Sequence, residues 1–98
     1  MTSKQRAYLR SLAVELDTIL YVGKGGLGPE ILKEADAALT KRELIKGRVL
    51  PDTCPASPRE AAEEIAAATR SQVVQVIGSR FVLYRRNPKQ PKITLPKP

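Results

Sequence analysis

The sequence contains no histidine, no tryptophan and a single cysteine, Cys54. Without histidine, the Ser-His and Cys-His catalytic arrangements are excluded, and most zinc sites lose a usual ligand. One cysteine forms no intramolecular disulfide, and Cys54 stands between prolines in an expected loop, where we assign it no chemical role. We therefore expect a protein that is not an enzyme and that has no metal, no cofactor and no small-molecule substrate.

Aromatic residues and long apolar runs are also scarce. Aromatic residues make up 4% of the chain, fewer than proteins that bind single strands by base stacking usually contain. No stretch approaches the roughly 20 apolar residues that a bilayer-spanning helix needs, and the first residues lack the apolar run of a signal peptide. The 98 residues give room for one domain. We expect a monomeric cytoplasmic domain without a membrane partner.

Acidic residues are fewer than basic ones: the chain has 10 Asp and Glu and 17 Lys and Arg, which gives a net charge of +7. The acidic residues gather mainly in segments 30–36 and 60–64. The basic residues gather in three other clusters: Lys4, Arg6 and Arg10; Lys41, Arg42, Lys46 and Arg48; and Arg80, Arg85, Arg86, Lys89, Lys92 and Lys97. If the two signs lie on opposite faces, the positive field suits a polyanion. The alternative is a solvated surface that only keeps the protein soluble.

Apolar periodicity, capping residues and turn residues predict three helices and four strands. The helices are expected over residues 3–16, 29–39 and 57–69, and the strands over residues 18–22, 43–50, 72–77 and 81–85. This order predicts an α/β two-layer sandwich, α-β-α-β-α-β-β, with helices packed on a four-stranded mixed sheet. In the second strand, Ile45, Gly47 and Val49 would face one side and Lys46 and Arg48 the other, so its outer face is expected to be cationic.

The chain is expected to divide into a domain over residues 1–86 and a basic tail over residues 87–98. The tail is rich in Pro and Lys, and it offers only Ile93 and Leu95 for burial. We expect it to be extended or disordered, and separable from the fold. The alternative is that residues 93–95 add an edge strand or dock on the core.

Residues 23–28, Gly-Lys-Gly-Gly-Leu-Gly, join an expected strand to an expected helix. Their Gly-x-Gly-x-x-Gly spacing matches a dinucleotide-binding loop. However, Arg48 stands where an acid is expected about 20 residues later, and the chain is too short for the full nucleotide-binding sheet. A Walker A loop is excluded because Pro29 and Glu30 follow Gly28 in place of Lys and a hydroxyl residue.

The same loop also contains Gly23-Lys24-Gly25-Gly26, a GxxG pattern of the kind with which KH domains clamp a nucleic-acid backbone. Small residues let a sugar-phosphate chain approach the protein backbone, and the lysine adds a positive charge. A turn that needs glycine only for a tight connection remains the alternative. We favour the clamp because a cationic strand follows it.

Several segments together give the chain a family resemblance. They are Lys4-Gln-Arg-x-x-Leu-Arg10, Val22-Gly-Lys-x-Gly-Leu27, Ala38-Leu39 with Glu43-Leu-Ile-Lys46, Val76-Ile-Gly78 with Val82-Leu-Tyr-Arg85, and Ile93-x-Leu95-Pro96. In this order they closely resemble the CRM (chloroplast RNA splicing and ribosome maturation) domain family in its stand-alone bacterial YhbY-like form. The resemblance covers essentially the whole chain. One departure is Gly47, where a β-branched residue is common, and we expect it to thin the core locally.

The resemblance implies a fold similar to the C-terminal domain of bacterial translation initiation factor three, with a KH-like RNA-binding surface around the GxxG loop. It also implies association with precursors of the large ribosomal subunit. From charge and resemblance together, the expected RNA-binding residues are Gly23, Lys24, Gly25, Gly26, Lys4, Arg6, Arg10, Lys46, Arg48, Arg85 and Arg86. The expected partner is rRNA or a pre-ribosomal large subunit. The alternative is a protein-interaction adaptor whose basic face meets an acidic partner on a ribonucleoprotein particle.

Overall fold

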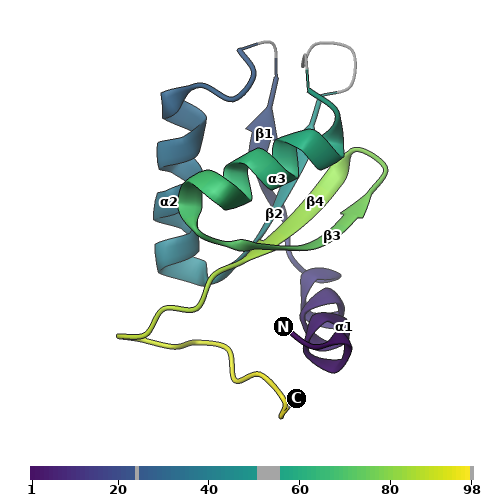
Figure 1. Ribbon diagram of the computed structural model, residues 1–98, viewed down its shortest axis with the longest axis vertical. Helices are drawn as coiled ribbons and strands as arrows, with labels where there is room; N and C mark the ends of the chain where they lie inside the picture. Colours follow the sequence, from purple (N-terminus) through teal and green to yellow (C-terminus); the bar gives the residue numbers. More distant parts are fainter. Residues whose placement is uncertain (24, 51–55, 98) are drawn as a thin grey trace.

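The protein, described here by a computed structural model for residues 1–23, 25–50 and 56–97, has three helices and four strands within those residues (Figure 1). Their bounds are α1 Ser3–Ala13, β1 Thr18–Val22, α2 Pro29–Arg42, β2 Leu44–Val49, α3 Pro58–Thr69, β3 Gln72–Ile77 and β4 Arg80–Tyr84. The predicted element order is confirmed, and each predicted boundary lies within about three residues of the observed one. Cys54, for which no role was expected, lies outside the described residues.

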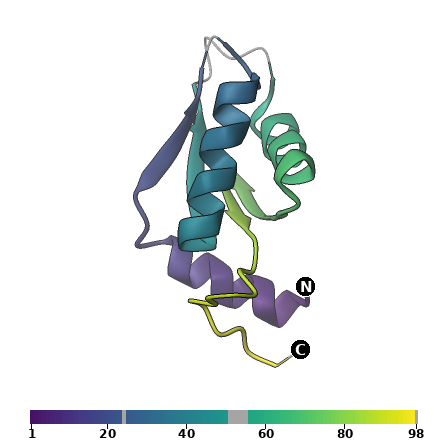
Figure 2. The same ribbon diagram turned by 90° about the vertical axis from the view of Figure 1, so that its left-hand side faces the viewer.

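The sheet has the order β1-β2-β4-β3, with β1 parallel to β2 and the other two pairs antiparallel. The predicted four-stranded mixed sheet is therefore confirmed. Helices α2 and α3 cover one face, whereas α1 lies against the opposite face at one end of the sheet (Figures 1 and 2). The rest of that second face carries no helix among the described residues, and we call it the open face.

Local sequence explains where the helices begin. The hydroxyl of Ser57 accepts from the backbone N–H of Glu60, whose carboxylate accepts from the N–H of Ser57, which confirms the predicted capping box. Thr2 and Gln5 form an equivalent box at α1, which the prediction missed. The chain leaves α1 three residues earlier than expected, because a turn after Ala13 redirects it into β1.

The main core lies between the sheet and helices α2 and α3. Alternate strand residues point into it, including Leu20 and Val22 of β1 and Ile45 and Val49 of β2. Helix α3 packs closely through its small buried side chains, since alanines occupy much of its inner face. Burial of this apolar surface is the dominant favourable contribution to folding.

Gly47 also belongs to this core, and the expectation that it thins the packing is wrong. It pairs directly with Phe81 on β4. A Cβ atom at Gly47 would overlap the Cζ, Cε1 and Cε2 atoms of the Phe81 ring, which is fully buried. The aromatic ring fills the space that a β-branched side chain would take, so glycine is the residue that fits.

A second, smaller core lies under α1. Its buried members are Leu9 and Ala13 of α1 together with Leu44, Val74, Val82 and Tyr84 of the sheet. Ile93 and Leu95 pack against this cluster from the C-terminal segment. The side-chain amide of Gln5 donates to the carbonyl of Pro96 at 3.0 Å, which holds the end of the chain beside α1 (Figure 2).

Glu43 fixes the start of that segment. Its side chain is 0% exposed and its backbone has a φ of 65°, between α2 and β2. The carboxylate accepts from the N–H groups of Asn87 at 2.6 Å, of Lys92, and of Ile93 at 2.8 Å. Burial acts to raise the pKa of Glu43, but these three N–H donors and the charge of Arg86 outweigh it, so the pKa lies below its ordinary value of 4.5.

These contacts hold the C-terminal segment against the rest of the protein. Residues 87–97 form no helix or strand, but they are docked on the second core and tied to Glu43. The separability of the tail from the fold stays a prediction, whereas the alternative that residues 93–95 dock on the core is confirmed. The reason is that Ile93 and Leu95 complete an apolar surface that α1 alone leaves partly uncovered.

Candidate nucleic-acid interface

The glycine loop lies where β1 ends and α2 begins, at the end of the sheet that also holds Val49, Ile77 and Arg80. We call this the loop end (Figure 1). The opposite end, with Leu44 and Tyr84, is called the tail end. At the loop end, the N–H of Leu50 donates to the carbonyl of Val22 at 2.8 Å. This bond holds the last residue of β1 against its neighbour, and the loop starts from a fixed position.

Within the loop, the N–H of Gly26 donates to the carbonyl of Gly23 at 2.9 Å, and Gly26 has a φ of 65°. This left-handed conformation favours glycine, so a turn requirement explains Gly26. It does not explain Gly25, because a Cβ there would have no atom of the described chain within 4 Å. Leu27 packs on the main core and anchors the loop. Lys24, the lysine of the GxxG pattern, lies outside the described residues.

A hollow lies between this loop and the first turns of α2, and Glu30 and Glu34 line it together with Tyr21 and the glycines. Two carboxylates make this hollow unfavourable for phosphate. Tyr21 lines this hollow and also belongs to the open face of the sheet, so it stands where the loop meets that face.

The open face carries the predicted cationic strand. Ile45, Gly47 and Val49 are buried on the helix-covered side, whereas Lys46 and Arg48 are partly exposed on the open face, as predicted. None of the described strand residues on this face is acidic.

Strand register brings residues from all four strands into one cross-strand row. Tyr21 of β1 pairs with Arg48 of β2, Arg48 pairs with Arg80 of β4, and Arg80 pairs with Ile77 of β3. Like charges directly opposite one another destabilise a sheet. Among the residues that the structure describes, neither arginine forms an ion pair, and the buried Nε of Arg48 has no hydrogen-bond partner. The two arginines are thus cross-strand neighbours without an ion-pair partner in the described part of the chain.

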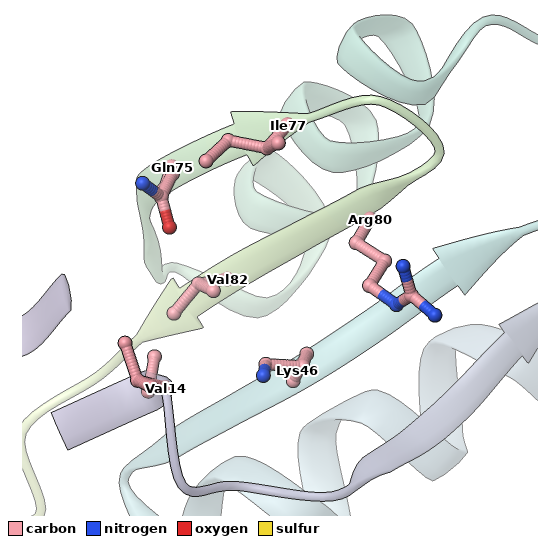
Figure 3. Close-up of a pocket in the computed structure, with 7 residues that line it drawn as sticks. Val14, Lys46, Gln75, Ile77, Arg80 and Val82 are labelled. Atoms are coloured by element: carbon pink, nitrogen blue, oxygen red, sulfur yellow. The ribbon is translucent and has the colours of Figure 1, made fainter. Parts of the chain in front are cut away.

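A second row, Lys46–Val82–Gln75, lies next to the first on the same face. Figure 3 shows these side chains with Val14, Ile77 and Arg80 around a hollow between the end of α1 and the hairpin of β3 and β4. The hollow has an apolar floor with polar and cationic groups at its edge. It is suited to a flat, partly apolar group that carries negative charge nearby.

Two of the predicted site residues have intramolecular partners. Arg6 donates through Nη1 to the carbonyls of Val73 at 2.7 Å and Val74 at 3.3 Å, which ties α1 to β3. Arg85 forms an ion pair with Asp36 and donates to the carbonyl of Thr69 at 2.8 Å. Both guanidinium groups are at or near the tail end. Their geometry gives them a structural role, which charge counting alone did not separate from binding.

Three other predicted cations are exposed but lie far from the loop end. Lys4 and Arg10 are exposed on α1, and Arg86 is exposed just after β4. All three lie away from the glycine loop. The residue that sequence reasoning missed is Arg80, which was counted as part of a basic segment but not assigned to the site. Only the strand register, which places it opposite Arg48, identifies it.

Acidic residues elsewhere form no site among the described residues. Glu63 and Glu64 are exposed on α3, and Glu63 pairs with Arg59 one turn away. Within the described chain no group of three or more metal-ligating side chains comes together, and no helix is long and apolar enough to cross a membrane.

Fold and site together define a small α/β protein with a glycine loop and an uncompensated cationic sheet face at the same end of the sheet. The chain belongs to the family described as the CRS1 / YhbY (CRM) domain, which matches residues 1–85. This confirms the resemblance noted in the sequence.

Relatives and a solved structure agree with this assignment. A Bacillus subtilis protein named "Probable RNA-binding protein YqeI" is 42% identical over 98% of this chain and 99% of its own length. A Haemophilus influenzae protein named "RNA-binding protein" is 35% identical over 99% of this chain and 96% of its own. The solution structure of the Staphylococcus aureus protein SAV1595 is similar, with a TM-score of 0.79 and 45% identity over 98% of this chain and 99% of that one.

Proposed function

We propose that this protein binds structured RNA through the glycine loop and the open sheet face, as a monomeric, non-enzymatic factor in the cytoplasm. Its RNA would be a precursor rRNA of the large ribosomal subunit. The observation that carries the proposal is the pair of uncompensated arginines, Arg48 and Arg80, at the end of the sheet where the glycine loop lies.

Two like charges directly opposite one another on neighbouring strands destabilise a sheet. Arg48 and Arg80 are such a pair, and neither has an ion-pair partner among the described residues. A phosphate backbone would relieve this repulsion, because each phosphate accepts charge-assisted hydrogen bonds from arginine. Lys46 on the neighbouring row adds a third positive charge.

The glycine loop is the second feature that supports RNA binding. Gly25 has open space around it, so a sugar-phosphate chain can approach the backbone there without meeting a side chain. Lys24 would donate to a phosphate at this point. Phosphate contacts fix position without reading sequence, so the shape of the RNA would supply most of the specificity.

The relatives support RNA as the ligand, since two of them are named as RNA-binding proteins or probable ones. The assignment to large-subunit assembly rests on the CRM resemblance. The competing function is a protein-interaction adaptor that presents the same basic face to an acidic protein. The absence of carboxylates from the described open face fits either polyanion, so the experiment must separate them.

The test combines binding and fractionation. Purified protein is titrated into a structured fragment of large-subunit rRNA at several salt concentrations. If about four to six phosphates are neutralised, log K falls with log [salt] at a slope of roughly −3 to −5. Tagged protein in cells should sediment with large-subunit precursors, and added RNA homopolymers should compete with the fragment. Sedimentation that survives nuclease treatment, with no binding to free rRNA, would support the adaptor instead.

A further inference from the structure

We infer that the open sheet face holds an unpaired segment of the RNA, with one base stacked on Tyr21 and the chain running across Arg48 and Arg80 to the apolar surface at Ile77. This inference rests on the proposed function and specifies what the open face adds to the glycine loop. Tyr21 and Ile77 are the site residues that it adds.

The residues at the two ends of the cross-strand row have exposed side chains. Tyr21 is 53% exposed and Ile77 is 62% exposed, although both lie within strands. Large apolar groups so exposed on a sheet that otherwise packs well indicate a contact surface. They stand at opposite ends of the row, with the two arginines between them. Three inter-strand spacings of about 4.8 Å make the row about 14 Å long.

The side chains of the row match the chemical groups of an unpaired nucleotide. An unpaired nucleotide offers a flat base and a charged phosphate, and the row offers an aromatic ring and an apolar surface on either side of two guanidinium groups. Base stacking on an aromatic ring needs an unstacked base, which a paired helix does not present. A duplex alone would therefore leave Tyr21 and Ile77 without a function.

The hollow in Figure 3 has a lining that suits a base. Val14, Ile77 and Val82 provide apolar surface, while Gln75 and Lys46 stand at its edge. A base lying on this surface could exchange hydrogen bonds with the side-chain amide of Gln75, whose carbonyl and amino groups can both pair with a base edge. The hollow is thus suited to a second base, next to the phosphate contacts of Arg80.

Tyr21 also connects this face to the glycine loop. It lines the hollow beside Gly23, Gly25 and Gly26, and it pairs in register with Arg48. Glu30 and Glu34 line the same hollow, and their carboxylates repel phosphate there. An RNA whose helical part contacts the loop would thus continue over Tyr21 onto the open face. The preferred ligand is a helix with an adjoining single-stranded segment.

Three RNAs and four variants test this. The probes are a hairpin of about 12 base pairs and the same hairpin with an unpaired extension of about four nucleotides at its 5′ end or at its 3′ end. Tyr21→Leu removes the ring and keeps an apolar side chain, Arg80→Gln removes one charge, and Ile77→Thr keeps the β-branch. The matched control is Arg59→Gln, which removes one positive charge from α3 on the opposite side of the sheet.

We expect the extension at one end to raise the affinity of the unsubstituted protein by about tenfold. Tyr21→Leu should abolish most of this gain and leave binding of the plain hairpin unchanged. Arg80→Gln and Ile77→Thr should each lose part of the gain, and Arg59→Gln none of it. The ring protons of Tyr21 should shift upfield in NMR spectra on addition of the extended RNA, but not on addition of the plain hairpin.

Three outcomes would overturn the inference. The extension could add nothing although the hairpin binds, or Tyr21→Leu could weaken the plain and the extended RNAs equally, which would mean that the row contacts the helix. The three variants could also bind all three RNAs normally, which would leave this face for a protein partner. Failure of the unsubstituted protein to bind any of the RNAs is different, since it would refute the proposed function itself.

Discussion

The basic residues at the two ends of the sheet differ in what surrounds their charged groups. At the loop end, Arg48 and Arg80 stand side by side with no ion-pair partner in the described chain. At the tail end, Arg85 is bonded to Asp36, Thr40 and Thr69. The same residue type is without an ion-pair partner at one end and bonded within the fold at the other.

The comparison shows why charge counting overestimates a binding surface. Hydrogen bonds to buried or partly buried carbonyls use the directional donors of an arginine, and a donor already engaged is lost to RNA. Net charge still contributes a long-range field wherever the residue lies. Contact residues and field residues should therefore respond differently to substitution, and the predictions below are designed to separate the two ends.

The largest effect is expected at the tail end. Deleting residues 87–98 removes Ile93 and Leu95 from the second core and takes away the three N–H donors of the Glu43 carboxylate. We expect a loss of about 3 kcal/mol or more and a fall in Tm of at least about 10 °C. Calorimetry measures it.

The control keeps the segment and removes only its charge. In the triple variant Lys89→Gln, Lys92→Gln and Lys97→Gln, the backbone contacts to Glu43 remain, so Tm should hardly change while RNA affinity falls modestly. An unchanged Tm after the deletion itself would show that the docked segment adds nothing to stability.

The next largest effect belongs to the glycine loop. Gly26→Asp and Gly26→Asn place side chains of equal size at a φ of 65°, which both residues tolerate better than other non-glycine residues do. The two variants should melt alike. Only Asp sets a negative charge beside the phosphate, so it should lose at least about tenfold in RNA affinity, and clearly more than Asn. Equal affinities would mean that no phosphate lies near Gly26.

Arg85→Gln and Arg48→Gln are expected to have opposite effects: the first should lower stability, and the second should lower RNA affinity. The first breaks contacts with Asp36 and Thr69, so it should destabilise the fold by about 1–3 kcal/mol and leave RNA affinity, measured well below Tm, nearly unchanged. The second should weaken RNA binding several-fold and leave stability unchanged or raise it by up to about 0.5 kcal/mol, because repulsion from Arg80 disappears. Equal losses of affinity in both variants would mean that RNA affinity depends only on net charge and not on the position of the arginine.

A smaller effect is expected for Lys24→Ala, which removes one charge-assisted contact, for a loss of about 1–2 kcal/mol of binding free energy and no change in folding. Glu63→Lys on α3 is the comparison, since it adds a positive charge on the far side of the sheet. If affinity follows net charge alone, Glu63→Lys should gain about as much as Lys24→Ala loses. Gel-shift titration at fixed salt distinguishes the two.

The smallest effect is one of pH at Glu43. Because its folded pKa is below the ordinary value of 4.5, its contribution to stability is fully present above about pH 4.5 and is lost as pH falls through the folded pKa. Tm should therefore fall at acidic pH more steeply than in Glu43→Gln, whose side chain does not titrate. Parallel curves for the two proteins would show that Glu43 contributes nothing to the pH dependence.

Much of the fold followed from local patterns in the sequence. Apolar periods located every helix and strand, and Ser57 with Glu60 marked the start of α3. The alternation along β2 correctly separated Lys46 and Arg48 from the core. Each of these signals involves residues within a few positions of one another, where helix or strand geometry alone fixes the relation.

The candidate site was only partly accessible in this way. Glycine spacing located the loop, but the pairing of Arg48 with Arg80 depends on β4 returning between β2 and β3, and no local pattern sets that register. The hollow that Glu30 and Glu34 line together with the glycines and Tyr21 also depends on how α2 packs beside β1. Gly47 was misjudged for a similar reason, since its partner Phe81 lies on another strand.

The sequence by itself determined the element order, the position of the glycine loop and the excess of positive charge. Tertiary structure alone decided which cations are engaged and whether the C-terminal segment is docked. Arg6 contacts Val73, and Glu43 contacts Ile93, across long stretches of intervening chain. The physical reason is that a free charge and a bonded one look alike in a sequence, and only packing of distant segments brings a donor to its acceptor.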